Sequence, residues 1–126
     1  CYIDNGEKSK NYRIKGVFHT VNPEANEVVP IYKENTREYT ILHSENFGKI
    51  LIVEVGAMLV GKIVNYHEEA SVKRGEEKGR FEFGGSTIIV CFEKGRIVID
   101  KDILCNSLNG IETLVKMGEK IGNTVV

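Results

Sequence analysis

The sequence predicts one small domain of mostly β structure. Its 126 residues include 13 glycines and only two prolines, and short runs of β-branched residues are separated by Gly or Asn. This pattern is typical of strands joined by tight turns rather than of a helical bundle. A chain of this length can bury one hydrophobic core but is too short for two, so we expect a single domain over residues 1–126.

Eight strands are predicted in chain order. Tyr39 and Ile41 alternate with polar residues and are expected to share one face of a half-buried strand, and Phe81 and Phe83 alternate in the same way. The run 50–53 is apolar throughout, which indicates a core strand buried on both faces, with a short helix as the alternative. The predicted strands are residues 28–33, 37–43, 49–55, 62–66, 79–83, 87–93, 96–100 and 114–116.

One eight-residue pattern occurs twice. Residues 72–79 align without gaps to residues 115–122 with five identities, and residues 55–61 are a looser relative. Glycine at the fourth and eighth places suits a turn with a positive φ angle followed by a returning strand. Such Val-Lys-x-Gly-Glu turns resemble those of barrel-sandwich hybrid folds, so we expect a small β domain of that kind. Convergent glycine turns are the alternative, and a short C-terminal helix over 111–121 is the alternative to the last strand.

Composition excludes several classes of function. Lys and Arg number 17 against 18 Asp and Glu, which gives no electrostatic reason to expect nucleic acid as a partner. No apolar run approaches the roughly 20 residues of a membrane span and no signal peptide opens the chain, so it is expected to be soluble. Cys1, Cys91 and Cys105 have no paired spacing, which favours a reducing compartment and predicts no metal site. The first residue is not Met, and an upstream part is expected.

The candidate site is the run Gly84-Gly85-Ser86-Thr87, which interrupts an otherwise continuous strand pattern. Taken alone, such a run is typical of a plain turn. A Gly-Ser bond also permits self-cleavage, because the Ser86 hydroxyl can attack the unhindered carbonyl of Gly85. Elimination from the resulting ester and hydrolysis would then leave a pyruvoyl group in place of Ser86. Its carbonyl could form a Schiff base with a substrate amine and accept the electrons released on decarboxylation.

Five ordered blocks make the resemblance to a known family specific. They are GVFHTVNP at 16–23, ENTR at 34–37, FGKI at 47–50, VGAMLVGKI at 55–63 and KRGEEKGRFEFGGST at 73–87. In order and spacing they resemble the phosphatidylserine decarboxylase family over about residues 16–122.

The resemblance implies a carboxy-lyase made as a zymogen and cleaved between Gly85 and Ser86. Residues 1–85 would end the β fragment, and residues 86–126 would form the α fragment, which begins with the pyruvoyl cofactor made from Ser86. The implied reaction converts phosphatidylserine to phosphatidylethanolamine, and the implied partners are the lipid, the complementary fragments and a membrane surface. The full-length enzyme would lie peripherally on the cytoplasmic side of the cell membrane, and homo-oligomerisation stays open.

The sequence departs from the family pattern in two ways. The family usually has Leu where Gly84 stands, although a Gly-Gly-Ser-Thr form also belongs to it. The segments that supply the Asp and His of the Asp-His-Ser maturation triad have no match and are expected before Cys1, so the isolated 126 residues should cleave slowly or not at all. No maturation role is given to the three histidines, and surface or packing roles are expected for them instead. They are His19, His43 and His67.

Three further interpretations complete the prediction. The mixed-charge run 73–80 is assigned to a solvated turn, with contact to an anionic lipid head group as the alternative, and Glu112 and Thr113 are assigned to packing or capping. A non-catalytic hybrid-barrel carrier or binding module is the alternative function, in which Gly84 and Gly85 only make a turn. A related serine lipid such as archaetidylserine would leave every sequence feature unchanged.

Overall fold

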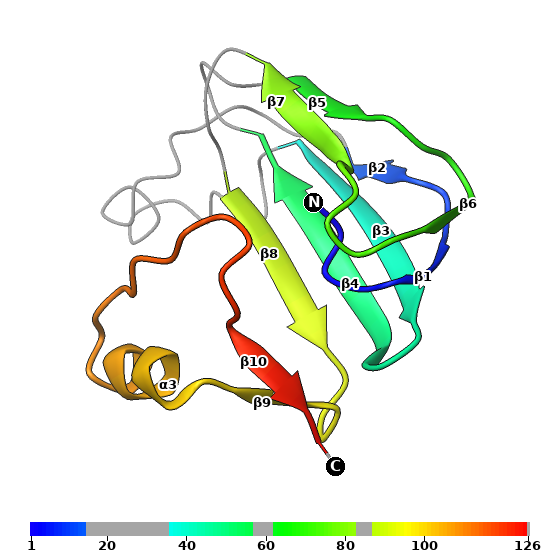
Figure 1. The fold of residues 1–126 in the computed structure, drawn as a ribbon. Coiled ribbons are helices and arrows are strands. Elements are labelled where there is room, and N and C mark those ends of the chain that lie inside the picture. The colour runs from blue at the N-terminus through cyan, green and yellow to red at the C-terminus, as the bar shows by residue number, and fades with distance from the viewer. Residues whose placement is uncertain (15–35, 57–61, 83–86, 126) are drawn as a thin grey trace.

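The fold is mostly β, as predicted. The structure is a computed structural model that describes residues 1–14, 36–56, 62–82 and 87–125. Within these ranges the chain forms three antiparallel sheets and one helix (Figure 1). In chain order the elements are β1 (Gly6–Lys8), β2 (Tyr12–Ile14), β3 (Arg37–Ser44), β4 (Gly48–Val55), β5 (Lys62–Asn65), β6 (Ala70–Val72), β7 (Gly79–Glu82), β8 (Thr87–Phe92), β9 (Ile97–Ile99), α3 (Lys101–Leu108) and β10 (Gly122–Thr124).

The largest sheet has the strand order β6-β1-β3-β4-β8, with β2 also paired to β3. β3 and β4 form a long hairpin whose register runs from Arg37 opposite Val55 to Ser44 opposite Gly48. Gly48 has a φ angle of 70°, a value that glycine adopts without steric cost, and this lets the chain turn tightly between the two strands. β8 pairs along the other side of β4, so β4 lies between β3 and β8.

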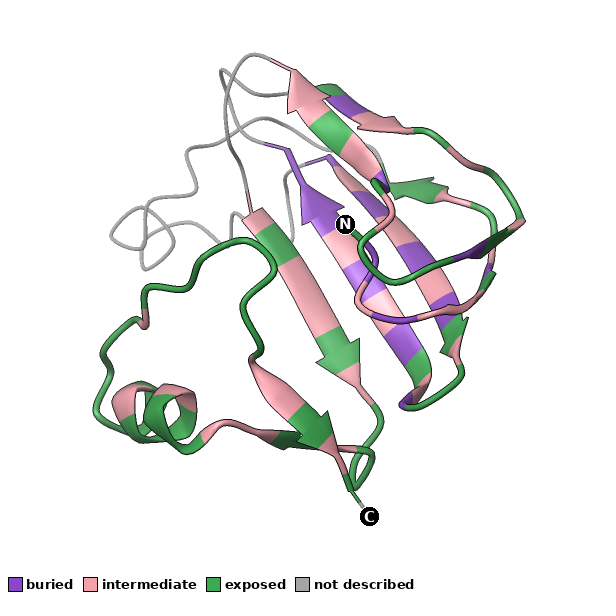
Figure 2. Cartoon of the chain, in the orientation of Figure 1, coloured by how far each residue is buried: buried purple, intermediate pink, exposed green. Residues whose placement is uncertain are grey.

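The core lies on one face of this sheet. Leu42 from β3 and Ile50 and Ile52 from β4 are buried there, and they pack with Tyr2, Phe47 and Val72. Figure 2 shows buried positions alternating with half-buried ones along both strands. The prediction that the run 50–53 is buried on both faces is therefore wrong in part, because Leu51 and Val53 point to the less covered face and are only half-buried.

Strand β3 shows a related difference. Tyr39 and Ile41 share a face, as predicted, but this face is only half-buried, and the opposite face of the strand is the buried one. The buried face of β3 carries Glu38, Thr40 and Leu42, two of which are polar. A polar residue on a buried face needs hydrogen-bond partners, and the partners of Glu38 come from other strands, described below.

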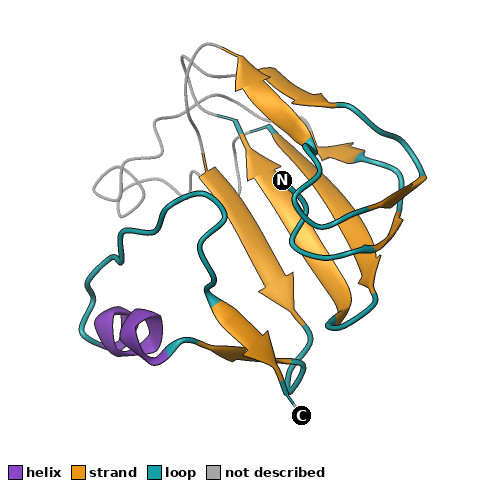
Figure 3. Ribbon diagram, viewed as in Figure 1, coloured by secondary structure: helices purple, strands orange, loops and turns teal. Residues whose placement is uncertain are grey.

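Two small sheets complete the described fold. β5 pairs with β7, and β9 pairs with β10. The strands of the described ranges therefore lie in three sheets and do not close into a single barrel (Figure 3). No helix among the described residues is long and apolar enough to cross a membrane.

The repeated sequence pattern forms a repeated turn. At 73–76 and at 116–119, the amide N–H of the last residue donates to the carbonyl oxygen of the first at 3.0 Å. Gly75 and Gly118 occupy the same place in the two turns, with φ angles of 81° and 82°. The prediction of two equivalent β-turns is confirmed, whereas the looser copy at 55–61 lies largely outside the described residues.

The eighth place of the pattern has a different requirement. Gly79 begins β7 and Gly122 begins β10, and a Cβ atom at either would collide with a backbone carbonyl oxygen of the partner strand, that of Val64 or Val98. Glycine is needed here because the two backbones approach closely, not because of its φ angle.

We expect Gly79→Ala to destabilise the natural protein by more than 2 kcal/mol, because β7 must move away from β5 to admit the methyl group. Gly75→Ala is the matched control: nothing lies within 4 Å of its added Cβ, so only the positive φ is disfavoured, at about 1 kcal/mol. Urea unfolding of both variants measures the difference. If both variants lost the same amount of stability, the close approach of the β5 and β7 backbones at Gly79 would be contradicted.

The C-terminal region differs most from prediction. Residues 111–121 form neither the predicted strand at 114–116 nor the alternative helix. No described strand pairs with residues 114–116, and Leu114 is 95% exposed, so this segment has no packing partner among the described residues. The one described helix is α3, which follows β9 after a single residue, Asp100, and has no buried residue. The short strands β1, β2, β6 and β10 were not predicted, and the predicted strand at 28–33 lies outside the described residues.

Candidate active site at the break between β7 and β8

The predicted cleavage residues fall between two strands of different sheets. Gly84, Gly85 and Ser86 lie outside the described residues, but both flanks are described: β7 ends at Glu82 and β8 begins at Thr87. Because β7 pairs with β5 and β8 pairs with β4, residues 83–86 connect two separately hydrogen-bonded sheets. We call these four residues the link.

The strand after the link is firmly held. β8 pairs with β4 along its whole length, from Thr87 opposite Val55 to Phe92 opposite Ile50. Phe92 also meets the Phe47 ring edge-on, with the ring centroids 6.0 Å apart. The residue that directly follows Ser86 is therefore fixed by the ladder of the main sheet.

A chain of polar contacts connects the main sheet to the β5–β7 sheet. Glu54 of β4 forms a buried ion pair with Lys78, which directly precedes β7. The Lys78 ammonium also donates to Oδ1 of Asn65 at 2.6 Å, and Nδ2 of Asn65 donates to Oε1 of Glu38 at 2.7 Å. Arg13 then donates to Oε2 of Glu38 through Nη2 at 2.7 Å and Nε at 3.1 Å. These contacts supply the partners that the buried Glu38 requires.

Glu38 and Glu54 stand directly opposite each other in the β3–β4 register. Two like charges opposite each other would destabilise the hairpin. Each carboxylate instead has its own cation, Arg13 for Glu38 and Lys78 for Glu54. The assignment of the whole run 73–80 to a solvated turn is therefore wrong for Lys78, which is 5% exposed because it neutralises a buried carboxylate.

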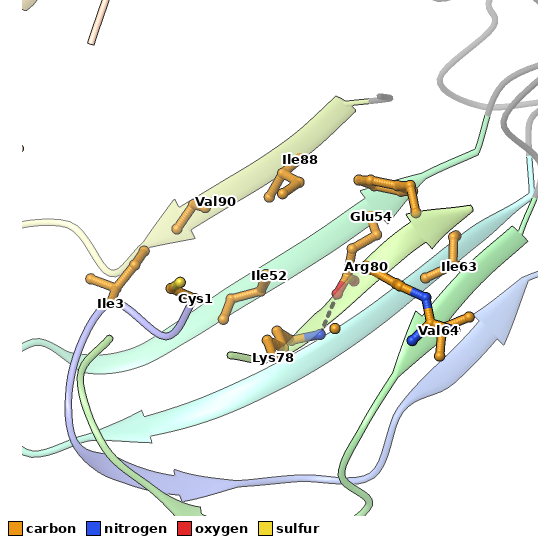
Figure 4. Close-up of a pocket in the computed structure, with 12 residues that line it drawn as sticks. Cys1, Ile3, Ile52, Glu54, Ile63, Val64, Lys78, Arg80, Ile88 and Val90 are labelled. Atoms are coloured by element: carbon orange, nitrogen blue, oxygen red, sulfur yellow. Dashed lines mark hydrogen bonds and ion pairs between the residues drawn. The ribbon is translucent and has the colours of Figure 1, made fainter. Parts of the chain in front are cut away.

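A cavity of about 130 Å³ lies beside this ion pair. Figure 4 shows residues of four strands and of the N-terminal segment around it, with the Glu54 to Lys78 contact on one side. Most of the wall is apolar, and it includes Ile52, Phe81 and Ile88. Phe81 and Ile88 come from the strands on either side of the link, so both strands that the link connects contribute to the cavity wall.

Glu54 is the electrostatically unusual group of this cavity. Burial raises the pKa of the Glu54 carboxyl above its usual value, although the positive charge of Lys78 acts in the opposite direction. Its Oε1 atom contacts Lys78, whereas its Oε2 atom is buried and has no hydrogen-bond partner in the described part of the chain. Sequence reasoning missed this residue, because a single Glu at the end of an apolar run carries no local signal of a partner 24 positions away.

The described histidines lie away from the cavity wall. His43 is exposed near the end of β3, and the ring of His67 contacts the Tyr2 hydroxyl at 3.2 Å and Glu76 at 3.8 Å. His19 lies outside the described residues. In the ranges that the structure describes, no three His, Cys, Asp or Glu side chains gather as metal ligands, and the absence of a metal stays a prediction.

Comparison with known proteins gives the family. A family model described as phosphatidylserine decarboxylase matches residues 1–123. Phosphatidylserine decarboxylase proenzyme 2 of Clostridium acetobutylicum is 51% identical over 124 residues, which cover 98% of this chain and 42% of the relative. The corresponding proenzymes of Clostridium botulinum strain Langeland and Clostridium perfringens are 49% and 51% identical, each over 97% of this chain and 42% of the relative. No solved structure matches.

These relatives are proenzymes of lipid decarboxylases, which favours an enzyme over the non-catalytic carrier. The chain belongs to the phosphatidylserine decarboxylase family, as its motifs indicated. It spans about 42% of the length of the curated relatives that it matches.

Proposed function

We propose that this chain is the C-terminal part of a phosphatidylserine decarboxylase proenzyme that cleaves itself between Gly85 and Ser86. The mature enzyme would then convert phosphatidylserine to phosphatidylethanolamine. The observation that supports this most is the position of the Gly-Gly-Ser-Thr run, which joins two strands that are each anchored in a different sheet. Breaking the link leaves every described strand pairing intact.

The bond that is cleaved and the hydroxyl that attacks it both belong to this chain, whereas the Asp and His that assist the attack are expected upstream of Cys1. The Ser86 hydroxyl attacks the carbonyl carbon of Gly85, which replaces the peptide bond by an ester and frees the amine of Ser86. A base then removes the Cα proton of Ser86, and the Gly85 carboxylate leaves. The dehydroalanine that remains tautomerises and takes up water, which releases ammonia and leaves a pyruvoyl group at the start of the α fragment.

The flanking structure fits this cofactor. The pyruvoyl group would be attached to Thr87, whose position is fixed by its pairing with Val55. It supplies an electron-accepting carbonyl for the decarboxylation. Ile88, the second residue of β8, forms part of the wall of an apolar cavity, which supports a reactive group at the start of this strand.

The two fragments have a large surface in common. After cleavage, β8 would still pair with β4 of the other fragment over six residue pairs, and Val90, Phe92 and Ile97 would still pack against the core of buried residues. The complementary fragments are therefore proposed as stable partners of each other. Because the substrate is a phospholipid, the full-length enzyme is placed peripherally at the cytoplasmic face of the cell membrane.

The cleavage is tested in the full-length protein that contains this chain. We expect denaturing electrophoresis to show two pieces, and mass spectrometry to show that the smaller piece begins at position 86 and lacks a free amine. Ser86→Ala should remain one piece and have no decarboxylase activity, because the attacking hydroxyl is absent. A wild-type protein that stays intact, or a Ser86→Ala protein that is cut at the same bond, would show that the proposal is wrong.

A further inference from the structure

The apolar side chains of the C-terminal region face outward. In α3 and the segment 109–117 that follows it, every large apolar residue except Ile103 is exposed, and Leu108, Leu114 and Met117 are 88%, 95% and 92% exposed. Figure 2 shows this region exposed along most of its length. We call the exposed set the C-terminal apolar surface; it consists of Leu104, Leu108, Ile111, Leu114, Val115 and Met117.

The polar residues of the same region make its internal contacts. Nδ2 of Asn106 donates to Oγ1 of Thr113 at 3.0 Å, and the amide N–H of Ile111 donates to the carbonyl oxygen of Asn106 at 2.8 Å. Asn106 and Thr113 are half-buried, whereas Leu108 and Leu114 are exposed. The segment after α3 is therefore held against the helix by its polar groups, and its apolar groups are left outside.

Nothing in the described core covers this surface. None of its six residues belongs to the cluster of buried residues or is among the half-buried residues packed against that cluster. Exposed apolar area is disfavoured in water, and monomeric proteins rarely leave a large contiguous patch of it unless the patch is an interaction site. The C-terminal apolar surface therefore has the character of a contact surface.

The charges of the region give no reason to expect a membrane there. Attraction to an anionic leaflet requires an excess of Lys and Arg close to the apolar residues. Residues 101–120 have no such excess, since three lysines are balanced by three acidic residues. They are Lys101, Lys116 and Lys120 against Asp102, Glu112 and Glu119. Lys120 is moreover paired with Asp100 at 3.5 Å.

The rest of the polypeptide is a partner of sufficient size. This chain covers 42% of the curated relatives, so more than half of their length lies outside the matched part. A segment tethered to the same chain has an effective concentration of about a millimolar, which favours it over a separate molecule. We infer that the C-terminal apolar surface is covered by the part of the polypeptide that precedes Cys1. This inference rests on the proposed function, which makes this chain the C-terminal part of a longer proenzyme.

The contact would have a role after the proposed cut. The C-terminal apolar surface belongs entirely to residues 86–126, whereas the part that covers it would belong to the other fragment. The two fragments would then be joined at a second place besides the pairing of β8 with β4.

Thiol labelling of the full-length protein tests whether the surface is covered. Leu114→Cys and the matched control Lys94→Cys each place a thiol at a position that is exposed in this chain, and both positions follow Ser86. In a Ser86→Ala background and without lipid, we expect maleimide to react at position 114 at least tenfold more slowly than at position 94, because the surface is covered. Mass spectrometry of the labelled peptides measures both rates, and equal rates would overturn the inference.

Photochemical cross-linking identifies what covers the surface. With p-benzoylphenylalanine in place of Leu108 in the same full-length protein, we expect a cross-link to a peptide that precedes Cys1 in the same molecule. The reaction is run on a mixture of isotope-labelled and unlabelled protein, with and without vesicles of phosphatidylcholine and phosphatidylglycerol. Cross-links between two copies would identify a second copy as the occupant, and cross-links to lipid alone would identify a membrane. Either result would overturn the inference, as would the absence of any cross-link.

Cleavage of the wild-type protein is measured separately. A protein whose surface is covered in this way but which is never cleaved would contradict the proposed cleavage alone. A protein that is cleaved normally, and whose Leu114→Cys thiol reacts as fast as the control, would contradict only the covered surface.

Discussion

Replacing Lys78 by methionine alone should destabilise the protein by about 3–5 kcal/mol, the largest effect expected for a side chain outside the apolar core. The substitution leaves the Glu54 carboxylate buried without its cation. Removing both charges in the Glu54→Leu and Lys78→Met double variant should restore most of the stability, because well-packed apolar side chains replace a buried ion pair at little cost.

Urea unfolding of the two single variants and the double variant gives the coupling free energy of the pair. The surface ion pair of Lys10 with Glu69, 3.9 Å apart with both side chains about two-thirds exposed, is the control, and Lys10→Met should change stability by less than 1 kcal/mol. Additive effects of the two buried substitutions would contradict the contact between Glu54 and Lys78.

Replacing Asp4 by asparagine should cost about 2 kcal/mol at pH 6 and almost nothing near pH 2. Asp4 is 1% exposed, and it accepts hydrogen bonds from Ser44, Asn46 and Arg74. Burial opposes its ionisation, but the hydrogen bonds from Ser44 and Asn46 outweigh that effect and lower the pKa from 3.8 to about 2. The carboxylate fastens the N-terminal segment to the β3–β4 turn.

The direction of the pH effect follows from that lowered pKa. Since the folded-state pKa lies below the unfolded value of 3.8, the stabilisation is complete above about pH 4 and is lost as the pH falls through about 2. The stability gap between the wild type and Asp4→Asn should narrow over the same range. Asp102→Asn, at an exposed carboxylate of α3, should show a gap below 0.5 kcal/mol at every pH. A pH-independent gap for Asp4 would contradict the assigned cause.

Local pattern predicted the features that depend on local chemistry. The glycines of the repeated turn were found because a positive φ angle restricts the residue type at single positions. The close backbone approach at the eighth place of the pattern was not predicted. The strands β3, β4, β5, β7, β8 and β9 were found within a few residues, since β-branched or aromatic residues and alternating patterns mark each of them locally.

The features that sequence reasoning missed depend on distant partners. β1 and β6 are only three residues long, and they exist because they pair with each other and because β1 also pairs with β3. The burial of Lys78 cannot be read from a charged turn, since it arises only when β4 places Glu54 next to it. Ser86 was predicted from its motif, whereas the cavity beside the link arises from residues far apart in the chain.

The separate anchoring of β7 and β8 also bears on how the mature protein could be assembled. Since the main sheet accepts β8 as an edge strand along β4, residues 86–126 have the form of a donated strand followed by its own small sheet and helix. The maturation cut would thus turn an intramolecular strand into an intermolecular one without changing its register. After the proposed cut, the smaller fragment would be a permanently bound ligand of the larger one, and it would carry the proposed reactive group at its N-terminal end.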